Sequence, residues 1–200
     1  TSYMFVTGPG VVKTVTSEEV TAEELGGALT HTTKSSVADG SFENDIEALL
    51  EVRRFLSYLP SCNDSKPSIR KTKDSIRRKT ESLDTLIPDN PNLPYDMKQL
   101  IVNIADEGIF FELQKDYAKN ILIGFIRLNG ETIGIVGNQP LVLAGCLDID
   151  SSRKAARFVR FCDAFNIPIL TLVDVPGFMP GTTQEYGGII KNGAKLLFAY

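Results

Sequence analysis

Tryptophan is absent from the 200 residues, histidine occurs once and cysteine occurs three times. Cys62, Cys146 and Cys162 are odd in number and far apart, which is typical of reduced, buried and inert thiols rather than of a disulfide framework or a metal site. His31 has no cysteine or second histidine nearby, so we interpret it as a structural hydrogen-bonding residue in a strand or loop. The sequence therefore predicts no metal in this chain.

An excess of positive charge and a long apolar run are also missing. The net charge of −4 and the pI near 5.1 argue against nucleic-acid binding, because a duplex-binding surface usually makes a domain basic. No apolar run is long enough to predict a membrane span, and no signal-peptide pattern is present. We therefore expect no nucleic-acid or membrane partner, and a location in the bacterial cytoplasm or the mitochondrial matrix.

Neither end of the chain has the pattern of a natural terminus. Thr1 is not a methionine, and residues 196–200 end in a helical pattern that has no C-cap. We therefore expect an excerpt of a longer protein that is inactive on its own.

Residues 167–195 carry the strongest functional signal. Ile167 to Val173 is an almost unbroken apolar run, which predicts a strand buried on both faces of a parallel sheet. The strand stops at Asp174, and the loop that follows contains Gly177 and Gly181, where a ligand can approach the backbone without meeting a Cβ atom.

A helix is predicted directly after this loop. Thr182 or Thr183 can cap it, Glu185 lies in its first turn, and apolar residues recur through residues 189–198 at helical spacing. A strand, a glycine-proline loop and a helix N-terminus in this order place free backbone N–H groups at the carboxyl edge of a sheet. The segment therefore predicts an anion or oxyanion site.

The preceding elements predict α/β architecture. Asp96 caps a helix that ends by Gly108, a short strand covers residues 110–114, and strands 121–128 and 131–136 form a hairpin through Asn129-Gly130. A helix from Ser151 or Ser152 follows, with one apolar face. The four cationic residues of that helix are predicted on its other sides: Arg153, Lys154, Arg157 and Arg160.

The first 94 residues are less regular. We predict a strand at residues 3–6 turned by Gly8-Pro9-Gly10, capping boxes at Thr16 with Glu19 and at Thr21 with Glu24, and an amphipathic helix within residues 41–59. The basic run 61–82 lacks stacking aromatic residues and predicts a solvated linker. Three prolines in residues 88–94 mark the clearest domain boundary.

Two other interpretations of the Asp174–Gly177 loop stay open. A strand followed by Asp-x-Pro-Gly also occurs in GTPases, where the acid helps to hold Mg²⁺, but no phosphate-binding G-x-x-x-x-G-K-[ST] motif precedes it. A purely structural loop is the ordinary alternative, because Asp at the end of a strand often only caps a turn.

Several motifs along nearly the whole chain, in order, resemble the carboxyltransferase part of biotin-dependent acyl-CoA carboxylases. They are Phe5-Val6-Thr7-Gly8-Pro9, Glu24-Leu25-Gly26-Gly27-Ala28, Leu86-Ile87-Pro88-Asp89, Asn138-Gln139-Pro140, Leu147-Asp148 with Ser152 and Lys154-Ala155-Ala156-Arg157-Phe158-Val159-Arg160, and Val175-Pro176-Gly177-Phe178 with Pro180-Gly181 and Gln184-Glu185. Only the basic run 61–82 matches poorly.

The resemblance implies two related crotonase-like domains built from ββα repeats, with the end of one and the start of a second in this chain. Residues 1–60 would close an acyl-CoA-binding domain, residues 61–94 would be a linker, and residues 95–200 would open a carboxybiotin-binding domain. It also implies a homo-oligomer, a dimer or hexamer of such chains, that works with a biotin carboxylase and biotin carrier partner.

The resemblance also suggests roles for particular residues. The backbone N–H groups of Gly177 and Phe178 would stabilise an oxyanion, which preorganised donors do effectively. Three residues would contact biotin, which is carried by the partner: Gly181, Gln184 and Glu185. Gly26 and Gly27 are weaker candidates for contact with acyl-CoA.

The expected reaction is transfer of a carboxyl group from carboxybiotin to a short-chain acyl-CoA, with propionyl-CoA as the expected substrate and methylmalonyl-CoA as the product. A decarboxylase subunit that runs the transfer backwards keeps the same fold. The alternative from a different class is a GTP-binding switch built on Asp174-Val175-Pro176-Gly177.

Overall fold

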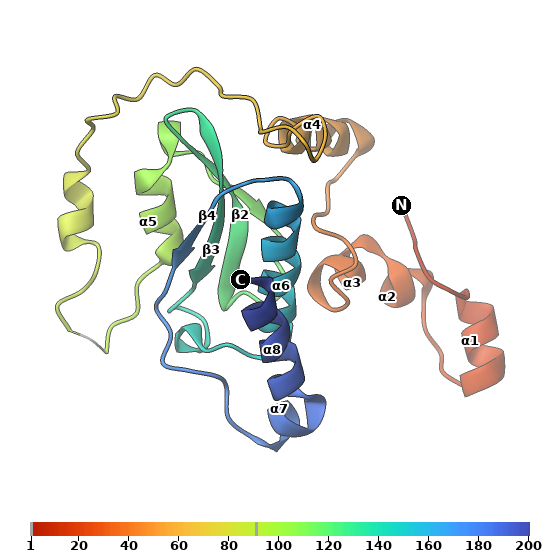
Figure 1. Ribbon diagram of the computed structural model, residues 1–200. Helices are drawn as coiled ribbons and strands as arrows, with labels where there is room; N and C mark the ends of the chain where they lie inside the picture. The colour runs from red at the N-terminus through yellow and green to blue at the C-terminus, as the bar shows by residue number, and fades with distance from the viewer. Residues whose placement is uncertain (1, 91) are drawn as a thin grey trace.

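The computed structural model describes residues 2–90 and 92–200, and its centre is one four-stranded sheet in the order β1-β2-β3-β4 (Figure 1). The strands are β1 Phe111–Leu113, β2 Ile121–Leu128, β3 Glu131–Asn138 and β4 Ile169–Leu172. Strand β2 pairs antiparallel with both β1 and β3, and β4 runs parallel to β3. Helix α6 (Ile149–Ala164) makes the crossover between β3 and β4, so the predicted α/β architecture is confirmed.

The hairpin between β2 and β3 forms where its turn residues predict it. Asn129 and Gly130 both have positive φ, at 51° and 78°, as a tight turn between twisted strands requires. Leu128 pairs with Glu131, so the turn contains only these two residues.

Two hydrophobic cores lie on opposite faces of the sheet. The alternation along β2 sends Ile123 and Phe125 towards α6, and Leu122 and Ile126 towards helix α5 (Met97–Ile104). On the α6 side, helix α8 (Ile189–Ala199) lies over α6 (Figure 1). The sheet is therefore a layer between helices, and this arrangement fixes the ends of β3 and β4.

Two predictions about this unit are wrong. Helix α6 begins at Ile149, two or three residues earlier than expected, because Asp148 forms a capping box with Ser151. Strand β4 is half-buried rather than enclosed on both faces, and Val173 beyond it is 73% exposed. The physical reason is that β4 is the last strand of the sheet and pairs only with β3 within the described chain.

Residues 2–60 form short helices, of which the last lies within the predicted amphipathic range 41–59, whereas the strand and turn predicted at residues 3–10 are wrong. They are α1 Pro9–Thr16, α2 Ala22–Gly26, α3 Ala28–Thr33 and α4 Asp45–Leu56. Pro9 occupies the first turn of α1, and residues 3–6 form no strand because no neighbouring strand pairs with them in the described structure.

The predicted caps and His31 in this region have mixed outcomes. The capping box of Thr21 with Glu24 is confirmed, whereas the one at Thr16 is wrong because no helix follows it. His31 lies in α3 rather than in a strand or loop, but its hydrogen bonds to Ser35 Oγ and to the Met4 carbonyl oxygen are structural.

The basic run 61–82 is not simply solvated. The Arg78 guanidinium donates hydrogen bonds to the carbonyl oxygens of Asn103, Ile104 and Ala105, where α5 ends. The Arg70 backbone N–H donates to Gly130 O in the hairpin turn, at 2.9 Å. Three short 3-10 turns complete the elements: η1 Glu81–Thr85, η2 Asp106–Gly108 and η3 Leu143–Gly145. The run is therefore a strap along the α/β unit, and its predicted role as a domain linker stays a prediction.

Candidate active site

The loop after β4 leads into two helices, not the single predicted one. Helix α7 (Thr182–Gly187) begins after Gly181, whose φ is 121°, and no side-chain hydrogen bond caps it, so the predicted threonine cap is wrong. Gly188 has φ 88° and separates α7 from α8. Because an L-residue rarely adopts these angles, Gly181 and Gly188 define the shape of the segment.

The centre of the loop is held by a single β-bridge between Leu147 and Phe178. Leu147 N–H donates to Gly177 O at 3.1 Å, and Met179 N–H donates to Leu147 O at 2.7 Å. These two bonds leave the N–H groups of Gly177 and Phe178 without a hydrogen-bond acceptor in the described part of the chain. The bridge thus fixes the backbone on both sides of the two predicted oxyanion donors.

The chain is open on the Cβ side of Gly177. Gly177 has φ 154°, and a Cβ atom at this position would have no neighbour within 4 Å, so its surroundings are open on the side-chain side. The Phe178 ring packs against Gly193 of α8 and is 49% exposed. Beside it is an apolar hollow of about 350 Å³, lined by Phe178, Glu185, Ile189, Ile190, Gly193, Ala194 and Leu197.

Asn138, at the end of β3, ties this loop to the turn before α6. Its Oδ1 accepts a hydrogen bond from Asp174 N–H at 3.2 Å, and its Nδ2 donates to Gly145 O at 3.0 Å. Gly145 lies close to Asp174, because a Cβ atom at position 145 would be 2.5 Å from Asp174 O. One buried amide therefore sets the spacing of the two segments that meet at the bridge.

Asp174 has a structural hydrogen bond of its own. Its Oδ2 accepts a hydrogen bond from the Tyr95 hydroxyl at 2.7 Å. Burial first, and then the Asp174 carboxylate, raises the pKa of Tyr95 to about 12, so this hydroxyl remains a donor at neutral pH. This contact agrees with a loop-holding role for Asp174.

The predicted biotin contacts lie at the end of this loop and in α7. Gly181 is open, Glu185 lines the hollow beside Phe178, and Gln184 lies between them in the sequence. The Gln184 side-chain oxygen accepts a hydrogen bond from Ile149 N–H at 3.1 Å, at the start of α6. Gln184 therefore braces α7 against α6.

The predicted acyl-CoA contacts lie elsewhere. Gly26 and Gly27 are buried at the junction of α2 and α3, which Figure 1 places apart from the loop before α7. A Cβ atom at Gly26 would collide with Met4 O, and one at Gly27 with Glu23. Both glycines are thus needed for close packing of the chain against itself.

Sequence reasoning placed Lys154 on an outer side of its helix, and this prediction is wrong. Lys154 is 3% exposed, and its ammonium donates to the carbonyl oxygens of Gln114, Tyr117, Ala118 and Ile121 at 2.7–3.2 Å. Burial lowers the pKa of Lys154 to about 8. The helical spacing could have predicted its burial, because Lys154 lies three residues after Ser151 and four before Phe158, which are both buried on the same side of α6.

Lys154 holds a turn that contacts the segment leading to the bridge. The turn that it holds ends at Asn120, whose Nδ2 donates to Cys146 O at 2.8 Å. Cys146 precedes Leu147, the residue that forms the bridge to the oxyanion loop. Lys154 and the bridge are therefore connected through the backbone of residues 118–121, the Asn120–Cys146 hydrogen bond and the Cys146–Leu147 peptide.

The three cysteines differ in burial, so the expectation that all are buried is wrong. Cys162 is fully buried, Cys146 is half-buried, and Cys62 is exposed in the basic run. Burial raises the pKa of Cys162 to about 12, whereas a hydrogen bond with Ser65 lowers the pKa of Cys62.

Residues 2–90 and 92–200 contain neither a candidate metal site nor a candidate membrane helix. No cluster of three or more His, Cys, Asp or Glu side chains has the geometry to hold a metal ion. Of the helices described, none has both the length and the apolar character to cross a membrane.

The match to a known family covers all of these elements. The family model of the carboxyl transferase domain matches residues 1–200. The chain therefore belongs to the carboxyl transferase domain family.

Within this family, the chain is similar to propionyl-CoA carboxylase β chains. It is 74% identical over 200 residues to the one of Cereibacter sphaeroides and 58% identical to the mitochondrial one of Homo sapiens. It is also 54% identical to methylmalonyl-CoA decarboxylase subunit alpha of Veillonella parvula. The three matches cover all of this chain but only 39%, 37% and 39% of the length of the relatives.

Solved structures agree with the fold. Transcarboxylase 12S, described as a hexamer assembly with hydrolysed methylmalonyl-coenzyme A bound, superposes with a TM-score of 0.96 at 47% identity, over 99% of this chain and 39% of that one. A single-chain, multi-domain long-chain acyl-CoA carboxylase superposes with a TM-score of 0.81 at 23% identity, over 98% of this chain and 19% of that one, which shows the fold alone. The crotonase-like fold class predicted from the sequence is confirmed.

Proposed function

We propose that the chain is part of a carboxyltransferase subunit that moves a carboxyl group from carboxybiotin to propionyl-CoA and forms methylmalonyl-CoA. The observation that carries the proposal is the pair of free backbone N–H groups at Gly177 and Phe178, in a loop that the bridge to Leu147 holds in place. The 74% identity to a propionyl-CoA carboxylase β chain supports the choice of substrate.

The loop suits this chemistry because the reaction develops negative charge on oxygen. When bound, carboxybiotin would supply the carboxyl group by cleavage of its N–C bond, and the α-carbon of the thioester would accept this group in place of its α-proton, which passes to the biotin nitrogen. The N–H groups of Gly177 and Phe178 donate to the oxygen that becomes negative, and each such preorganised donor lowers a barrier by about 3–4 kcal/mol. The hydrogen bonds of Asn138 and Leu147 position these donors before the substrate arrives.

We assign the biotin side of the reaction to residues 95–200 and the acyl-CoA side to the domain that residues 1–60 close, with residues 61–94 as the linker. Glu185 lines the hollow beside Phe178, and Gly181 and Gln184 lie just before it in the chain, which supports contact with the biotin ring. Gly26 and Gly27 contribute to acyl-CoA binding only by packing the helices that shape its domain.

Other chains complete the enzyme in this proposal. The carboxylated biotin arrives on a biotin carboxylase and carrier partner, and several copies of the subunit assemble, as the hexameric transcarboxylase 12S does. The proposed location is the bacterial cytoplasm or the mitochondrial matrix, because the reported relatives include a bacterial protein and a mitochondrial one.

The reverse reaction is the second candidate, favoured by the 54% identity to a methylmalonyl-CoA decarboxylase subunit. The same oxyanion donors would serve both directions, because a transition state is common to a reaction and its reverse. A GTP-binding switch has less support, since the Asp174 carboxylate is engaged by Tyr95 and the family is one of carboxyl transferases.

The test uses the full-length subunit assembled with its biotin-bearing partner. Incorporation of labelled bicarbonate is measured with acetyl-, propionyl- and butyryl-CoA, and biotin-dependent decarboxylation is measured with methylmalonyl-CoA. We expect the highest kcat/KM with propionyl-CoA. Transfer to none of the thioesters, together with saturable binding of GTP and Mg²⁺, would overturn the proposal.

A further inference from the structure

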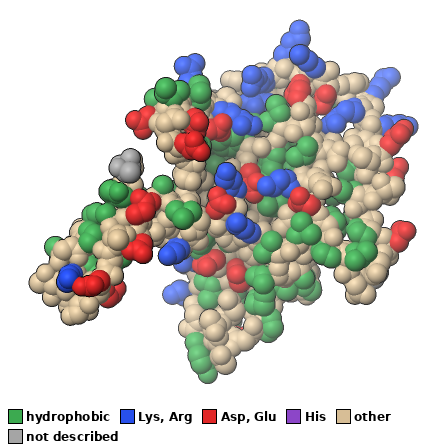
Figure 2. Space-filling view, turned by 180° about the vertical axis from the view of Figure 1, so that it is seen from behind, with side chains coloured by type: hydrophobic (Ala, Val, Ile, Leu, Met, Phe, Trp, Pro, Cys, Tyr) green, Lys and Arg blue, Asp and Glu red, His purple; other side chains and the backbone are tan. Residues whose placement is uncertain are grey.

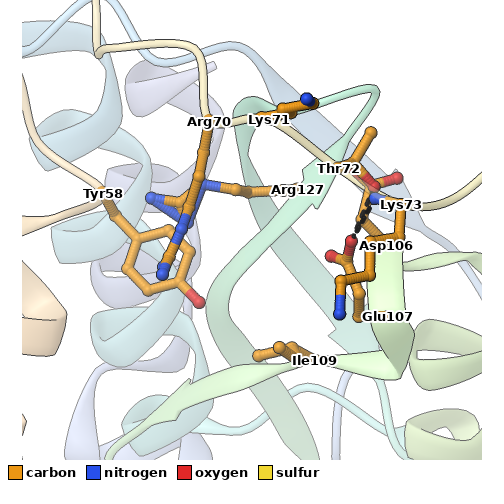
Figure 3. Close-up of a pocket in the computed structure, with 9 residues that line it drawn as sticks. All are labelled: Tyr58, Arg70, Lys71, Thr72, Lys73, Asp106, Glu107, Ile109 and Arg127. Atoms are coloured by element: carbon orange, nitrogen blue, oxygen red, sulfur yellow. Dashed lines mark hydrogen bonds between the residues drawn. The ribbon is translucent and has the colours of Figure 1, made fainter.

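A second site, at the opposite edge of the sheet from the Gly177 loop, collects charge that the proposed reaction does not use. It is a pocket of about 270 Å³ between the basic strap, the β2–β3 turn and η2 (Figure 3). Four cationic side chains line it: Arg70, Lys71, Lys73 and Arg127. Figure 2 shows Lys and Arg side chains along the same upper edge of the molecule, where Figure 1 draws the strap.

Arg127 is the buried part of this pocket. It is 8% exposed, and its guanidinium lies over the Tyr58 ring at 4.2 Å and donates through Nη2 to Ser57 O at 2.6 Å. Its Nε–H is buried and has no hydrogen-bond partner in the described structure. A buried charged donor without an acceptor is costly, so Arg127 lines the pocket with unmet hydrogen-bonding capacity.

Arg70 places a second guanidinium beside Arg127 (Figure 3). Burial lowers the pKa of Arg127, and so does the charge of Arg70, but both groups stay cationic at neutral pH. Neither arginine forms an ion pair within 4 Å in the described ranges, so only the more distant charges of Asp106 and Glu107 offset their mutual repulsion. An anion between them would relieve it.

The two carboxylates of the pocket are already engaged. The Asp106 oxygens accept from the N–H groups of Asn129 and Gly130 at 3.1 and 2.7 Å. Glu107 Oε1 accepts from the Thr72 hydroxyl and from Lys73 N–H, each at 2.8 Å. These bonds hold the walls in place, and the four cationic side chains outnumber the two carboxylates by two charges.

We propose that this pocket binds a phosphate group. Its buried arginine fork supplies directed donors, and its lysines supply charge, which is the combination that recognises phosphate. The phosphate comes either from free inorganic phosphate or from the phosphates of a coenzyme A thioester. The site lies apart from the loop that carries the proposed reaction, so binding does not depend on turnover.

The binding test compares two substitutions in the full-length subunit that remove the same charge from the same strap. Arg70→Gln changes a residue that lines the pocket, and Arg77→Gln changes an exposed residue that does not. Calorimetric titration with inorganic phosphate at constant ionic strength should give saturable binding to the wild type and to Arg77→Gln. Arg70→Gln should weaken it about tenfold, the effect of losing one charge-assisted hydrogen bond.

The source of the phosphate is separated by titrating coenzyme A and 3′-dephospho-coenzyme A. If Arg70→Gln weakens the binding of coenzyme A tenfold but not that of 3′-dephospho-coenzyme A, the result supports the proposal and assigns the site to the 3′-phosphate. A loss for inorganic phosphate, with both nucleotides unaffected, supports it and assigns the site to the free ion. Unsaturable phosphate binding by the wild type, or equal losses in the Arg70 and Arg77 variants, would overturn it.

Discussion

Helices α4 and α6 have similarly amphipathic sequences and very different surroundings. Helix α6 buries eight of its 16 residues against the sheet and α8, whereas α4 buries none of its 12. Along α4, Ile46, Leu49 and Leu50 are each at least 60% exposed. The comparison teaches that an apolar stripe and good caps are enough to specify a helix, but that stability and a positioned site come from what the stripe packs against.

The largest expected effect is in the core beneath α6. Phe125→Ala removes a fully buried ring that contacts Tyr58, Phe158 and Phe161, so we expect the free energy of unfolding to fall by about 3–5 kcal/mol. Urea unfolding of the 200-residue chain, followed by circular dichroism, measures the change. A loss below about 1 kcal/mol would show that this core contributes no more than α4 does.

The strap gives a second, smaller contrast. Arg78→Gln removes donors from three carbonyl oxygens at the end of α5, whereas Arg77→Gln removes an exposed charge one residue earlier. We expect Arg78→Gln to lower the free energy of unfolding by about 1–3 kcal/mol and Arg77→Gln to change it little. Equal effects in the same unfolding assay would restore the view of the run as a solvated linker.

The cysteines test the burial difference by pH. Because burial raises the pKa of Cys162 to about 12 from 9.0, its contribution to stability is fully present below pH 9 and is lost as the pH rises from 9 towards 12. In Cys162→Ala this part of the pH slope should be absent.

In the wild type, iodoacetamide should modify exposed Cys62 first, and Cys162 at least about a thousandfold more slowly, as expected from three pKa units. Mass spectrometry of the modified peptides shows the order, and early modification of Cys162 would contradict it.

The smallest expected effect is in α4. Leu50 is 60% exposed, so Leu50→Ala should change the free energy of unfolding of the 200-residue chain by less than about 0.5 kcal/mol. A loss of 2 kcal/mol or more in the urea titration would mean that α4 is packed in solution and that its contrast with α6 is false.

The sequence predicted elements whose signals are local. The Asn129-Gly130 turn, the Asp96 cap and the Thr21 capping box all form as expected, because adjacent residues determine them. Residues 3–6 failed as a strand because a strand also needs a neighbour to pair with. Lys154 was misplaced because its acceptors lie 33 to 40 residues away in the sequence.

In the candidate site too, the features with local signals were predicted and those that depend on long-range contacts were not. The order of strand, glycine loop and helix located Gly177 and Phe178, and it needed no knowledge of distant contacts. The bridge from Leu147 and the tie from Asn138 could not be predicted, because both depend on how the turn before α6 meets the loop after β4. These long-range contacts are what turn a flexible loop into a preorganised one.

The central claim is that the backbone N–H of Phe178 stabilises developing negative charge, and an amide-to-ester replacement at that residue tests it most directly. The ester removes one N–H and keeps the side chain, whereas a proline at Gly177 could not adopt its φ of 154°. Carboxyl transfer to propionyl-CoA by the assembled enzyme should fall about a hundredfold, with little effect from the matched ester at Val175 and about tenfold or less from Asp174→Asn. An active Phe178 ester and an inactive Asp174→Asn variant would place the chemistry on the carboxylate and contradict the account.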